Sequence, residues 1–520
     1  MREIKIEDIV IVGGGMSGWL AALTLEKDYN ITIIESPDIS IIGVGESTQP
    51  GLIRFMADHN FSPSQWMPEV SATYKLGVMF EGWSNNKFMV DSESHLLNIV
   101  DTTEDIKINI HDICIANKTS TNEYFNCFPP YRMAIENKSP CFSDERFNYL
   151  GGNATTTNKA VHWDNRLMVD ALKKECLKRN ITFIQDTVVD VNLDEDGYVK
   201  EIITNNSKIT GDLYLDCTGF KSMLLSKLDV SWNSIENHLY NNNAVAIRKQ
   251  YTNPQEECHP YTKATAMNSG WMWSIPTYKD IAYGYVYSDK YIDKDEAEKE
   301  LRLKIDEWEA SAFHVPFRTG AVDRVAYKNV CGIGNSVAFI EPLEATNFTF
   351  TTEMINYLRR ILAYSNNRWN PKVENSLHIL FDARFKELLF FIFMHFHSAN
   401  KNDTLYWQDT ANTPLPGYAK NLYNKLKDYP ISQSDLVDYF WDGHPFTKDI
   451  KSDYITMFHN GHWWQLLKGN NWYENAESPL SDDVVKYGNA IMDINKYRVD
   501  KVIKLFPNHY DYLTKWYESC

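Results

Sequence analysis

The sequence lacks the features of an exported, membrane-spanning or zinc-binding protein. Its eight cysteines form no CxxC pair and no zinc-ligand spacing, which favours reduced thiols. Its longest apolar run, Leu388 to Phe396, is far shorter than the roughly 20 residues of a membrane-spanning helix. The N-terminal residues enter a predicted strand without a signal-peptide pattern, so we expect a cytoplasmic protein.

Positive charge is also scarce. Lys and Arg total 52 against 69 Asp and Glu, giving a net charge of -17, and no basic run is present. This balance argues against a broad nucleic-acid-binding surface. Hydrophobic residues make up 43% of the 520 residues and aromatic residues 13%. The chain can therefore build two or three domains, or one large cofactor-binding fold with a cap.

The first informative segment, residues 7–35, predicts a strand, a glycine turn, a helix and a second strand. Gly13, Gly15 and Gly18 satisfy the pattern G-x-G-x-x-G, and Glu35 ends the second strand where an acidic residue binds a ribose hydroxyl. Such glycines let the backbone approach a pyrophosphate at a helix N-terminus. The predicted dinucleotide-binding residues are Gly13, Gly14, Gly15, Met16, Ser17, Gly18 and Glu35.

Later segments predict further parts of the same site. "IIGVGEST" contains a second glycine turn with Gly45, Glu46 and Ser47, for which a plain surface turn is the alternative. A predicted strand ends at Asp216, and the turn "VCGIGNS" brings Gly334 to a similar edge. One fingerprint with distant partner segments is typical of an FAD fold, and a second fingerprint for NAD is missing. Between these segments, residues 162–176 predict a helix.

The character of the chain changes after about residue 365. Long amphipathic segments, such as residues 376–396 and 482–506, predict a mainly helical region. We therefore expect an α/β fold, with a Rossmann-like FAD-binding domain of the flavin monooxygenase type over residues 1–365. Residues of about 90–150 would contribute to the substrate site, and a mainly helical cap would cover residues 366–520.

Two tryptophans stand one residue apart in "GWMWSIP". Alternation predicts a strand with Trp271 and Trp273 on one face, and Pro276 ends it because proline cannot donate to a sheet ladder. Taken alone, the segment is most simply interpreted as core filling, because aromatic residues bury well in strands.

The order of the segments resembles that of a known family. With "GGGMSG", "GVGEST", "TYKLGVMFEGW", "DCTGF", "GWMWSIP" and "IEPLEAT" in this order, the chain resembles the flavin-dependent halogenases, which include the tryptophan halogenases. The match is tight over residues 1–365 and loose beyond. It implies that Trp271, Trp273, Ile275 and Pro276 line a passage beside the flavin and keep organic substrate away. It also implies FAD contacts at Val188, Asp216 and Gly334.

The resemblance gives Lys75 the family's catalytic position. Apolar neighbours suggest a partly desolvated ammonium, which suits a group that must hydrogen-bond or react with hypohalous acid. An ordinary solvated lysine is the alternative. Glu344 of "IEPLEAT" would face the site and take the proton from the ring carbon, although a helix N-terminal acid stabilised by the macrodipole is a second interpretation.

The chain also departs from the family pattern. Thr346 and Asn347 stand where the family has a Thr-Gly pair whose amides hold the halide, and Asn keeps the turn possible because it tolerates left-handed dihedrals. On the substrate side, His95 is followed by Leu97 where an aromatic residue is expected, which places free tryptophan in doubt. Trp463 and Trp464 are candidates for the other wall, with aromatic core as an equal explanation.

We therefore predict an FAD-dependent halogenase that uses O2 and halide, chloride or bromide, to form hypohalous acid. Lys75 would receive the acid and halogenate an electron-rich aromatic substrate of the indole or phenol type. The missing NAD fingerprint implies that a separate flavin reductase supplies reduced FAD. The alternatives are a flavin-dependent monooxygenase on the same fold and a non-catalytic flavin-binding protein. A homodimer or higher homo-oligomer is left open.

Overall fold

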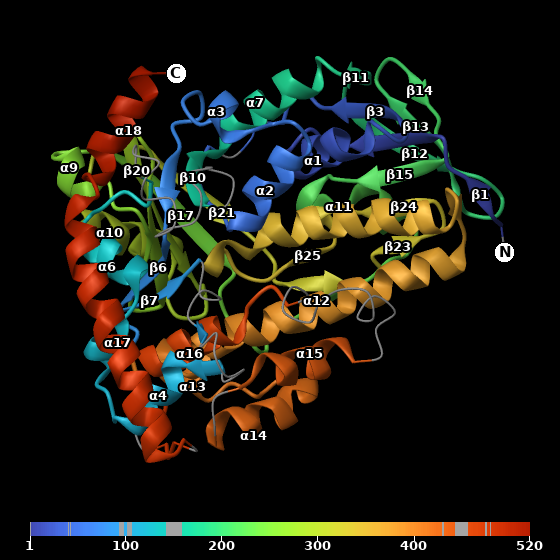
Figure 1. The fold of residues 1–520 in the computed structure, drawn as a ribbon. Helices are drawn as coiled ribbons and strands as arrows, with labels where there is room; N and C mark the ends of the chain where they lie inside the picture. Colours follow the sequence, from blue (N-terminus) through green and yellow to red (C-terminus); the bar gives the residue numbers. More distant parts are fainter. Residues whose placement is uncertain are drawn as a thin grey trace. The chain divides into compact units, whose positions relative to one another are not determined.

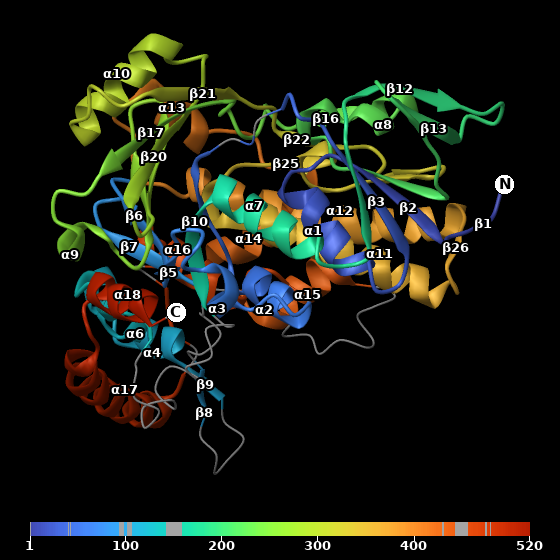
Figure 2. The same cartoon turned by 90° about the horizontal axis from the view of Figure 1, so that it is seen from above.

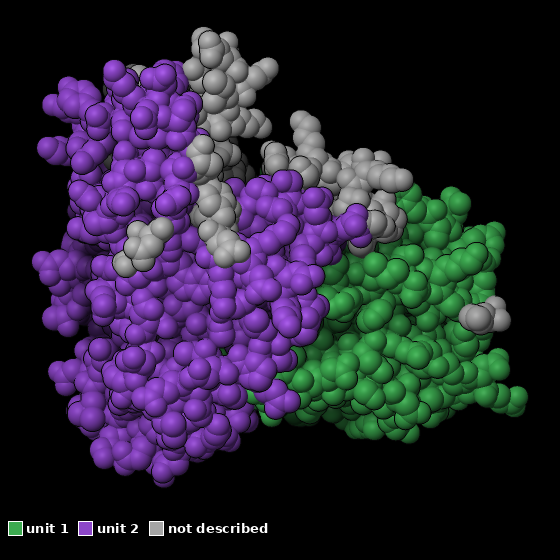
Figure 3. Space-filling view, turned by 90° about the horizontal axis from the view of Figure 1, so that it is seen from below, with its two compact units in different colours: residues 1–71, 163–236, 317–388 green, residues 72–162, 237–316, 389–520 purple. Residues whose placement is uncertain are grey.

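The computed structural model describes residues 2–39, 41, 43–92, 98–100, 107–141, 159–428, 431–442, 456–473, 476–478 and 480–519. The chain forms two compact units, each assembled from three separate stretches (Figure 3). Unit 1 comprises residues 1–71, 163–236 and 317–388, and unit 2 comprises residues 72–162, 237–316 and 389–520. The predicted boundary at residue 365 falls within the third stretch of unit 1.

Unit 1 is built on a six-stranded sheet with the order β11-β3-β2-β15-β24-β23, and Figure 1 labels all of these strands except β2. Its strands are β2 (Asp8–Val12), β3 (Asn30–Glu35), β11 (Ile181–Gln185), β15 (Leu213–Asp216), β23 (Ala326–Tyr327) and β24 (Val330–Gly332). The strands are parallel except β23, which pairs antiparallel with β24. The apolar residues 9–12 of β2 are buried, as expected for an inner strand of a parallel sheet. The strand-helix-strand prediction over residues 7–35 is confirmed.

Helices α1 (Met16–Leu25), α7 (Asn165–Cys176) and α11 (Thr346–Tyr364) belong to the same unit. Helix α1 packs against both α7 and α11, and Figure 2 shows α1 and α7 running side by side. Nine of the ten residues of α1 are buried, which explains why its sequence is apolar on every side rather than amphipathic.

The helix predicted over residues 162–176 begins later than expected. Helix α7 starts at Asn165, because the Asp164 side chain accepts a hydrogen bond from the backbone N of Leu167 at 3.1 Å and so caps the helix. The preceding residues form strand β10 (Ala160–Asp164), so the prediction is wrong for its first three residues.

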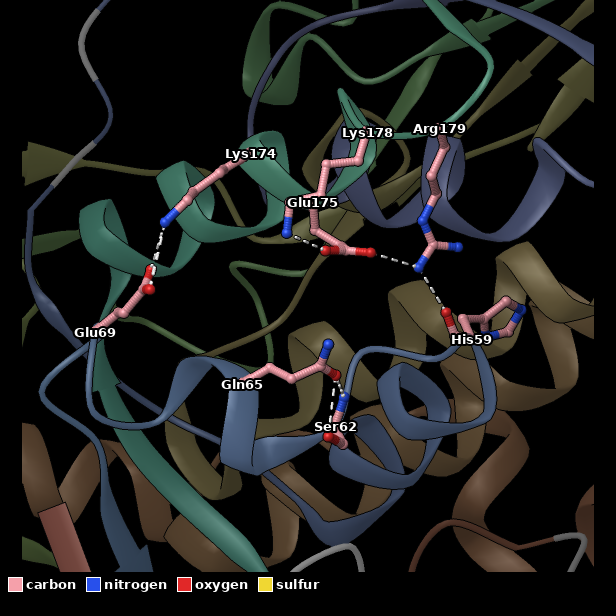
Figure 4. Close-up of polar contacts among 8 residues, drawn as sticks. All are labelled: His59, Ser62, Gln65, Glu69, Lys174, Glu175, Lys178 and Arg179. Carbon is pink, nitrogen blue, oxygen red and sulfur yellow. Dashed lines mark hydrogen bonds and ion pairs between the residues drawn. The ribbon is translucent and has the colours of Figure 1, made fainter. Parts of the chain in front are cut away.

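Charged residues at the end of α7 hold the segment before residue 70 (Figure 4). Arg179 Nη2 donates to the carbonyl oxygen of His59 at 2.8 Å and also reaches Glu175 Oε1 at 3.1 Å. In the same segment, the backbone N of Ser62 donates to Gln65 Oε1 at 2.7 Å and caps the short helix α3 (Pro63–Trp66). These contacts fix the chain that leads from the second glycine turn toward unit 2.

The remaining elements of unit 1 are small or peripheral. Three sets of strands pair with one another: β1 (Ile4–Lys5) with β26 (Arg368–Trp369); β12 (Val188–Leu193), β13 (Val199–Thr204) and β14 (Lys208–Ile209); and β16 (Trp232–Ser234), β22 (Gly320–Val322) and β25 (Ala338–Phe339). The other elements are β4 (Gly45–Ser47), α2 (Pro50–Asp58), α8 (Met223–Lys227) and α12 (Pro371–His397), which continues into unit 2.

Unit 2 is built on a seven-stranded sheet with the order β21-β17-β20-β19-β18-β6-β7. Its strands are β6 (Gly77–Glu81), β7 (Phe88–Asp91), β17 (Asn243–Gln250), β18 (Thr262–Ala266), β19 (Gly270–Pro276), β20 (Asp280–Tyr287) and β21 (Ala312–Pro316). Every pair is antiparallel except β18 with β6. The short strand β5 (Thr73–Lys75) pairs antiparallel with β10 outside this sheet.

The helices of unit 2 include the C-terminal region that the sequence predicts to be mainly helical. Helix α10 (Lys294–Ile305) packs on one face of the seven-stranded sheet. The others are α4 (Ile110–Ala116), α5 (Thr121–Asn126), α6 (Pro129–Ile135), α9 (Pro254–Glu257), α13 (Leu405–Ala411), α14 (Lys420–Asp428), α15 (Gln433–Trp441), α16 (Asn460–Gly469), α17 (Asp482–Val502) and α18 (His509–Glu518). In the described part of the chain, no helix has the length and apolar character needed to cross a membrane.

Candidate active site

The first glycine turn has the geometry of a dinucleotide site. Gly13 has a φ of 118°, and a Cβ there would lie 2.3 Å from the carbonyl oxygen of Cys217. A Cβ at Gly18 would lie 2.0 Å from the carbonyl oxygen of Gly13. A Cβ at Gly15, by contrast, would meet no described atom within 4 Å. Two of these glycines are therefore required by packing, and Gly15 leaves an open space where α1 begins.

Glu35 lies against this turn, and one of its two carboxylate oxygens can accept a further hydrogen bond. Its Oε1 accepts a hydrogen bond from Lys173 Nζ at 2.8 Å, while Oε2 is buried and has no partner among the described residues. A Cβ at Gly14 would lie 2.3 Å from Oε2, so only glycine lets the carboxylate approach the turn. An unpaired acceptor costs free energy unless a donor arrives, and a ribose hydroxyl is such a donor.

These features fit FAD. The open side of Gly15 faces the N-terminus of α1, whose first backbone N–H groups and dipole favour a pyrophosphate. The unpaired Oε2 of Glu35 matches a ribose hydroxyl. The predicted residues of the first turn are thus brought together at the start of α1, with Met16 and Ser17 opening the helix, and their contact with the cofactor stays a prediction.

The ends of strands β15 and β24, with Asp216 and Gly334, have different structural roles. Asp216 is fully buried, and its carboxylate accepts hydrogen bonds from Thr218 and from the backbone N of Leu224 and Leu225 at 2.6–3.1 Å. Its side chain therefore fixes the turn into α8. Gly334 has a φ of 72°, and a Cβ there would lie 2.2 Å from Ser17 Oγ, so the turn after β24 lies against the start of α1.

The second glycine turn forms strand β4 rather than an irregular surface turn. Gly45 and Ser47 are buried and Glu46 is partly buried, and burial raises the pKa of Glu46 to about 8. This carboxyl is therefore largely protonated at neutral pH. Val188, another predicted cofactor residue, begins β12 and follows Thr187, whose hydroxyl contacts the hydroxyl of Ser36 at 2.8 Å.

Glu344 stands in a strained turn before α11. Glu344 and Ala345 have φ values of 62° and 55°, and each left-handed non-glycine residue costs roughly 1–2 kcal/mol. The turn is held by Gln49, whose Nε2 donates to the carbonyl oxygen of Glu344 at 2.7 Å. The Glu344 side chain is buried, with 3% of its surface exposed. Such strain at a buried acid is typical of functional sites.

The predicted halide residues open helix α11. Thr346 and Asn347 are in its first turn, where backbone N–H groups lack intrahelical partners and the helix dipole favours an anion. The left-handed conformation falls on Glu344 and Ala345, and Asn347 is helical. The tolerance of asparagine for left-handed dihedrals is therefore not what preserves this turn.

Lys75 lies at the end of β5 in unit 2, opposite Ala160 of β10. Only 1% of its surface is exposed, so it is not the ordinary solvated lysine of the alternative interpretation. The strand continues through Leu76, whose backbone N donates to the carbonyl oxygen of Pro260 at 2.7 Å. Burial of this kind makes an ammonium a stronger donor to whatever group lies beside it.

A buried histidine lies beside Lys75. His162 pairs with Thr73 in the β10–β5 ladder, and its Nδ1 lies 3.1 Å from Thr73 Oγ1. Its Nε2 lies 2.9 Å from Thr262 Oγ1. Burial, and after it the positive charge of Lys75, holds the pKa of His162 well below its ordinary value, so the ring is neutral.

A second buried histidine holds the other edge of β5. His509 of α18 accepts a hydrogen bond from the backbone N of Tyr74 at Nε2, at 3.2 Å, and its Nδ1 lies 3.1 Å from the carbonyl oxygen of Cys258. The ring of Tyr74 packs against His509, Tyr512 and Trp516 of the same helix. Strand β5 is therefore fixed along both edges.

The segment "GWMWSIP" is strand β19, and all seven of its residues are buried. Met272 faces the cluster that contains α10, so Trp271, Trp273 and Ile275 lie on the opposite face. The ring of Trp273 lies across Gly284 of β20, where a Cβ would be only 1.9 Å away. Burial fits both a core and a passage wall, and the wall stays a prediction.

The substrate candidates are only partly described. His95 and Leu97 lie outside the described residues. Trp463 of α16 is 1% exposed and packs against Phe390 and Phe391. Trp464 stacks on His111, with ring centroids 4.5 Å apart. Both tryptophans therefore have aromatic core contacts, and their role as a substrate wall stays a prediction.

Comparisons with known proteins decide the family. The family model described as tryptophan halogenase matches residues 8–486. The chain belongs to the tryptophan halogenase family. The 7-chloro-L-tryptophan 6-halogenase KtzR of Kutzneria sp. (strain 744) is 31% identical over 433 residues, which cover 78% of this chain and 82% of that protein. The tryptophan 7-halogenase RebH of Lentzea aerocolonigenes is 27% identical over 497 residues, covering 91% of each.

Solved structures of the family share the fold. The tryptophan 6-halogenase SttH from Streptomyces toxytricini gives a TM-score of 0.86 at 26% identity, covering 98% of this chain and 99% of that chain. Membership of the tryptophan halogenase family makes this protein a flavin-dependent halogenase with FAD as its cofactor, and the monooxygenase alternative is not favoured.

Several residues of this tryptophan halogenase site were missed by sequence reasoning. Thr73 opens the motif "TYKLGVMFEGW", but the motif predicts no role for it. His162 contacts Thr73 and Thr262, and Gly284 lies under the ring of Trp273, yet His162, Thr262 and Gly284 belong to no recognisable motif. The one signal was the pattern "AVHWD", because alternation continues through His162 and an aspartate cap follows it. The helix prediction from residue 162 obscured that signal.

Proposed function

We propose that this halogenase uses O2 and a halide ion, with reduced FAD delivered by a separate flavin reductase, to halogenate an electron-rich aromatic substrate. When bound, reduced FAD supplies the electrons with which O2 and halide are converted to hypohalous acid and water. The observation that carries the proposal is the buried Lys75 on a strand fixed along both edges.

The cofactor residues are those of the first glycine turn. The α1 N-terminus beside Gly15 would hold the pyrophosphate, and Glu35 Oε2 would accept a hydrogen bond from the ribose. Gly334 and Ser17 lie in contact at the same end of α1 and would form the adjoining wall. The halide would bind the backbone N–H groups of Thr346 and Asn347 in the first turn of α11.

Lys75 would activate hypohalous acid by hydrogen bonding. Its ammonium donates to the hydroxyl oxygen, which makes the halogen atom electrophilic. The aromatic carbon attacks the halogen, the halogen–oxygen bond breaks, and the leaving hydroxide takes a proton from Lys75 to become water. Glu344 accepts the proton lost from the ring carbon, then releases it as Lys75 regains one from solvent, so both groups return to their starting states. The net change is replacement of one ring hydrogen by halogen, with one water formed.

The substrate class follows from chemistry and from the relatives. An electrophilic halogen requires an electron-rich ring, and the relatives named above act on tryptophan or chlorotryptophan. Because Leu97 replaces the aromatic residue of the expected substrate sandwich, we propose larger indoles, phenols or anilines in preference to free tryptophan. The lost stacking contact is worth roughly 0.5–1.5 kcal/mol.

The test separates formation of hypohalous acid from its use. We expect Lys75→Ala to oxidise reduced flavin at the parent rate and to release the hypohalous acid, which can be trapped. The yield of aromatic product should fall by about a hundredfold or more. Lys263→Ala is the matched control, because Lys263 belongs to the same unit but is partly exposed and paired with Glu81 at 3.7 Å. Product at the parent rate from Lys75→Ala would show that another group activates the acid.

A further inference from the structure

We propose that His162 is a positioning residue for Lys75, and that the hydrogen-bonded chain His162–Thr73–Pro276 sets where the ammonium lies relative to the tryptophan strand β19. The inference rests on the proposed function of Lys75. Its consequence is that the chain decides how much hypohalous acid reaches the aromatic substrate and how much escapes.

The ladder between β5 and β10 places the side chains on one face. Thr73 pairs with His162, and Lys75 pairs with Ala160. Residues two apart on a strand point the same way, so Thr73, Lys75 and His162 share a face. Diagonal neighbours in such a ladder are roughly 7–8 Å apart at their Cα atoms, within reach of a long side chain.

The proton positions in this chain follow from the hydrogen bonds. Thr73 Oγ1 donates its single proton to the carbonyl oxygen of Pro276 at 2.6 Å. It must therefore accept at its other contact, so His162 Nδ1 carries the proton and donates. The remaining ring nitrogen, Nε2, is then an acceptor for the hydroxyl of Thr262.

Each group in the chain is buried, so the chain resists displacement. His162 and Thr73 have no measurable exposure, and Lys75 has 1%. Breaking a buried hydrogen bond leaves an unsatisfied polar group, which makes alternative rotamers costly. Because the ring of His162 is neutral, it supports the ladder without adding a second positive charge beside the ammonium.

The chain also joins two parts of the proposed mechanism. Pro276 ends β19, the strand that carries Trp271 and Trp273, and Lys75 ends β5. The hydroxyl of Thr73 links these two strands directly, through the carbonyl oxygen of Pro276. A shift of β5 would move the ammonium relative to the tryptophans and so allow acid to bypass Lys75.

The sharpest test removes one hydroxyl. In the FAD-loaded enzyme, Thr73→Val keeps the shape of the side chain but loses both hydrogen bonds, whereas Thr73→Ser keeps the hydroxyl. We expect the ratio of aromatic product to trapped hypohalous acid to fall about tenfold in Thr73→Val and to stay within about threefold in Thr73→Ser. Thr265→Val is the control, because Thr265 lies opposite Met272 on the α10 face.

A second pair of variants tests the histidine. His162→Leu removes the donor to Thr73, while His162→Asn keeps an N–H at the position of Nδ1. We expect His162→Leu to lower the product ratio as Thr73→Val does, and His162→Asn to retain most of it. Flavin oxidation should stay at the parent rate in all these variants, a result that general unfolding would not give.

The outcomes separate this inference from the proposed function. If Lys75→Ala loses product while Thr73→Val and His162→Leu keep the parental ratio, the positioning role is wrong and the function of Lys75 stands. If Lys75→Ala retains product, the proposed function itself fails. A parallel loss of product and flavin oxidation in Thr73→Val would show a structural role only and would overturn the inference.

Discussion

The turn at residues 13–18 of unit 1 depends on glycines, which have no side chain. The strand at residues 73–75 of unit 2 is held by hydrogen bonds to side chains of other segments. At Gly13 and Gly18 a single Cβ would collide with a carbonyl oxygen, at 2.3 and 2.0 Å. At β5, the ring of His162 donates a hydrogen bond to Thr73, and the ring of His509 accepts one from the backbone N of Tyr74. The glycine turn is specified by its own short segment and by one distant carbonyl, that of Cys217, whereas β5 is held by side chains from several distant segments.

The difference follows from what we propose each region to bind. A pyrophosphate is recognised by backbone N–H groups, so the site needs glycines that let the backbone approach. A small neutral acid has to be met by one donor at one place, so the site needs a lysine with little freedom. Fixing the strand that carries this lysine requires contacts on several elements, and in unit 2 these come from β10, β18, β19 and α18.

The largest expected effect contrasts two glycines of the same turn. Gly18→Ala should destabilise the protein by roughly 1–3 kcal/mol or more, because its Cβ meets the carbonyl oxygen of Gly13. Gly15→Val should leave the melting temperature of the FAD-free protein unchanged, since the new side chain enters open space. We expect it to weaken FAD binding by about a hundredfold or more.

Thermal unfolding of the FAD-free protein and titration with FAD measure the two effects separately. Gly417→Val is a control, because a Cβ at Gly417 also meets nothing within 4 Å. Gly417 is exposed and belongs to unit 2. Unchanged FAD affinity in Gly15→Val would show that the cofactor does not use the open side of α1.

This contrast also explains how far the sequence could predict the structure. The strands and helix of residues 7–35 follow from hydrophobic periodicity and a glycine spacing, both of which act within one short segment. The position of Lys75 could be inferred from a motif, but its support by His162 could not. That support depends on the pairing of β10 with β5, and strand pairing across some 85 residues leaves no periodic signal.

Local patterns also misled where tertiary contacts decided the outcome. The amphipathic pattern extends the predicted helix back to His162, whereas the side chain of Asp164 caps the helix and the ladder with β5 keeps His162 extended. At "IEPLEAT", the left-handed residues are Glu344 and Ala345 rather than the more tolerant asparagine. Strain of this kind is stored at a site and cannot be predicted from residue preference.

The next expected effect is on the pH dependence of stability, and it arises from one neutral titratable group in each unit, Glu46 in unit 1 and His162 in unit 2. Glu46 in unit 1 has a pKa raised from 4.5 to about 8, so between these pH values the unfolded chain releases a proton that the folded protein keeps. Stability therefore falls as pH rises, by at most about 1.4 kcal/mol per pH unit. The pKa of His162 is lowered in the folded protein. Its contribution to the free energy of unfolding is therefore present at neutral pH and is lost as pH falls below 6.5.

Glu46→Gln should remove the first trend, because glutamine resembles the protonated carboxyl at every pH. We expect the variant to match the parent near pH 4.5 and to be more stable at pH 8, while the acid-side trend from unit 2 persists. Chemical denaturation at several pH values provides the measurement. Parallel curves for the variant and the parent would mean that Glu46 is ionised in the folded protein.

The smallest expected effect is at the start of α11, where a side chain and backbone N–H groups lie at the same predicted halide site. Asn347 adds a side chain to a helix N-terminus that otherwise offers only backbone N–H groups. We expect Asn347→Gly to change the ratio of chlorinated to brominated product by about twofold to fivefold, a difference of roughly 0.5–1 kcal/mol, in favour of chloride.

The expected direction follows from the carboxamide, which can donate to a larger and more polarisable anion that sits farther from the backbone. Competition between equal chloride and bromide, with product ratios measured on one aromatic substrate, tests this selectivity directly. Asn347→Ala distinguishes the two causes, since it removes the amide without adding glycine's flexibility. If Asn347→Ala shifts the ratio as Asn347→Gly does, the side chain sets the preference. If neither variant shifts it, halide choice in unit 1 depends on the backbone N–H groups of α11 alone.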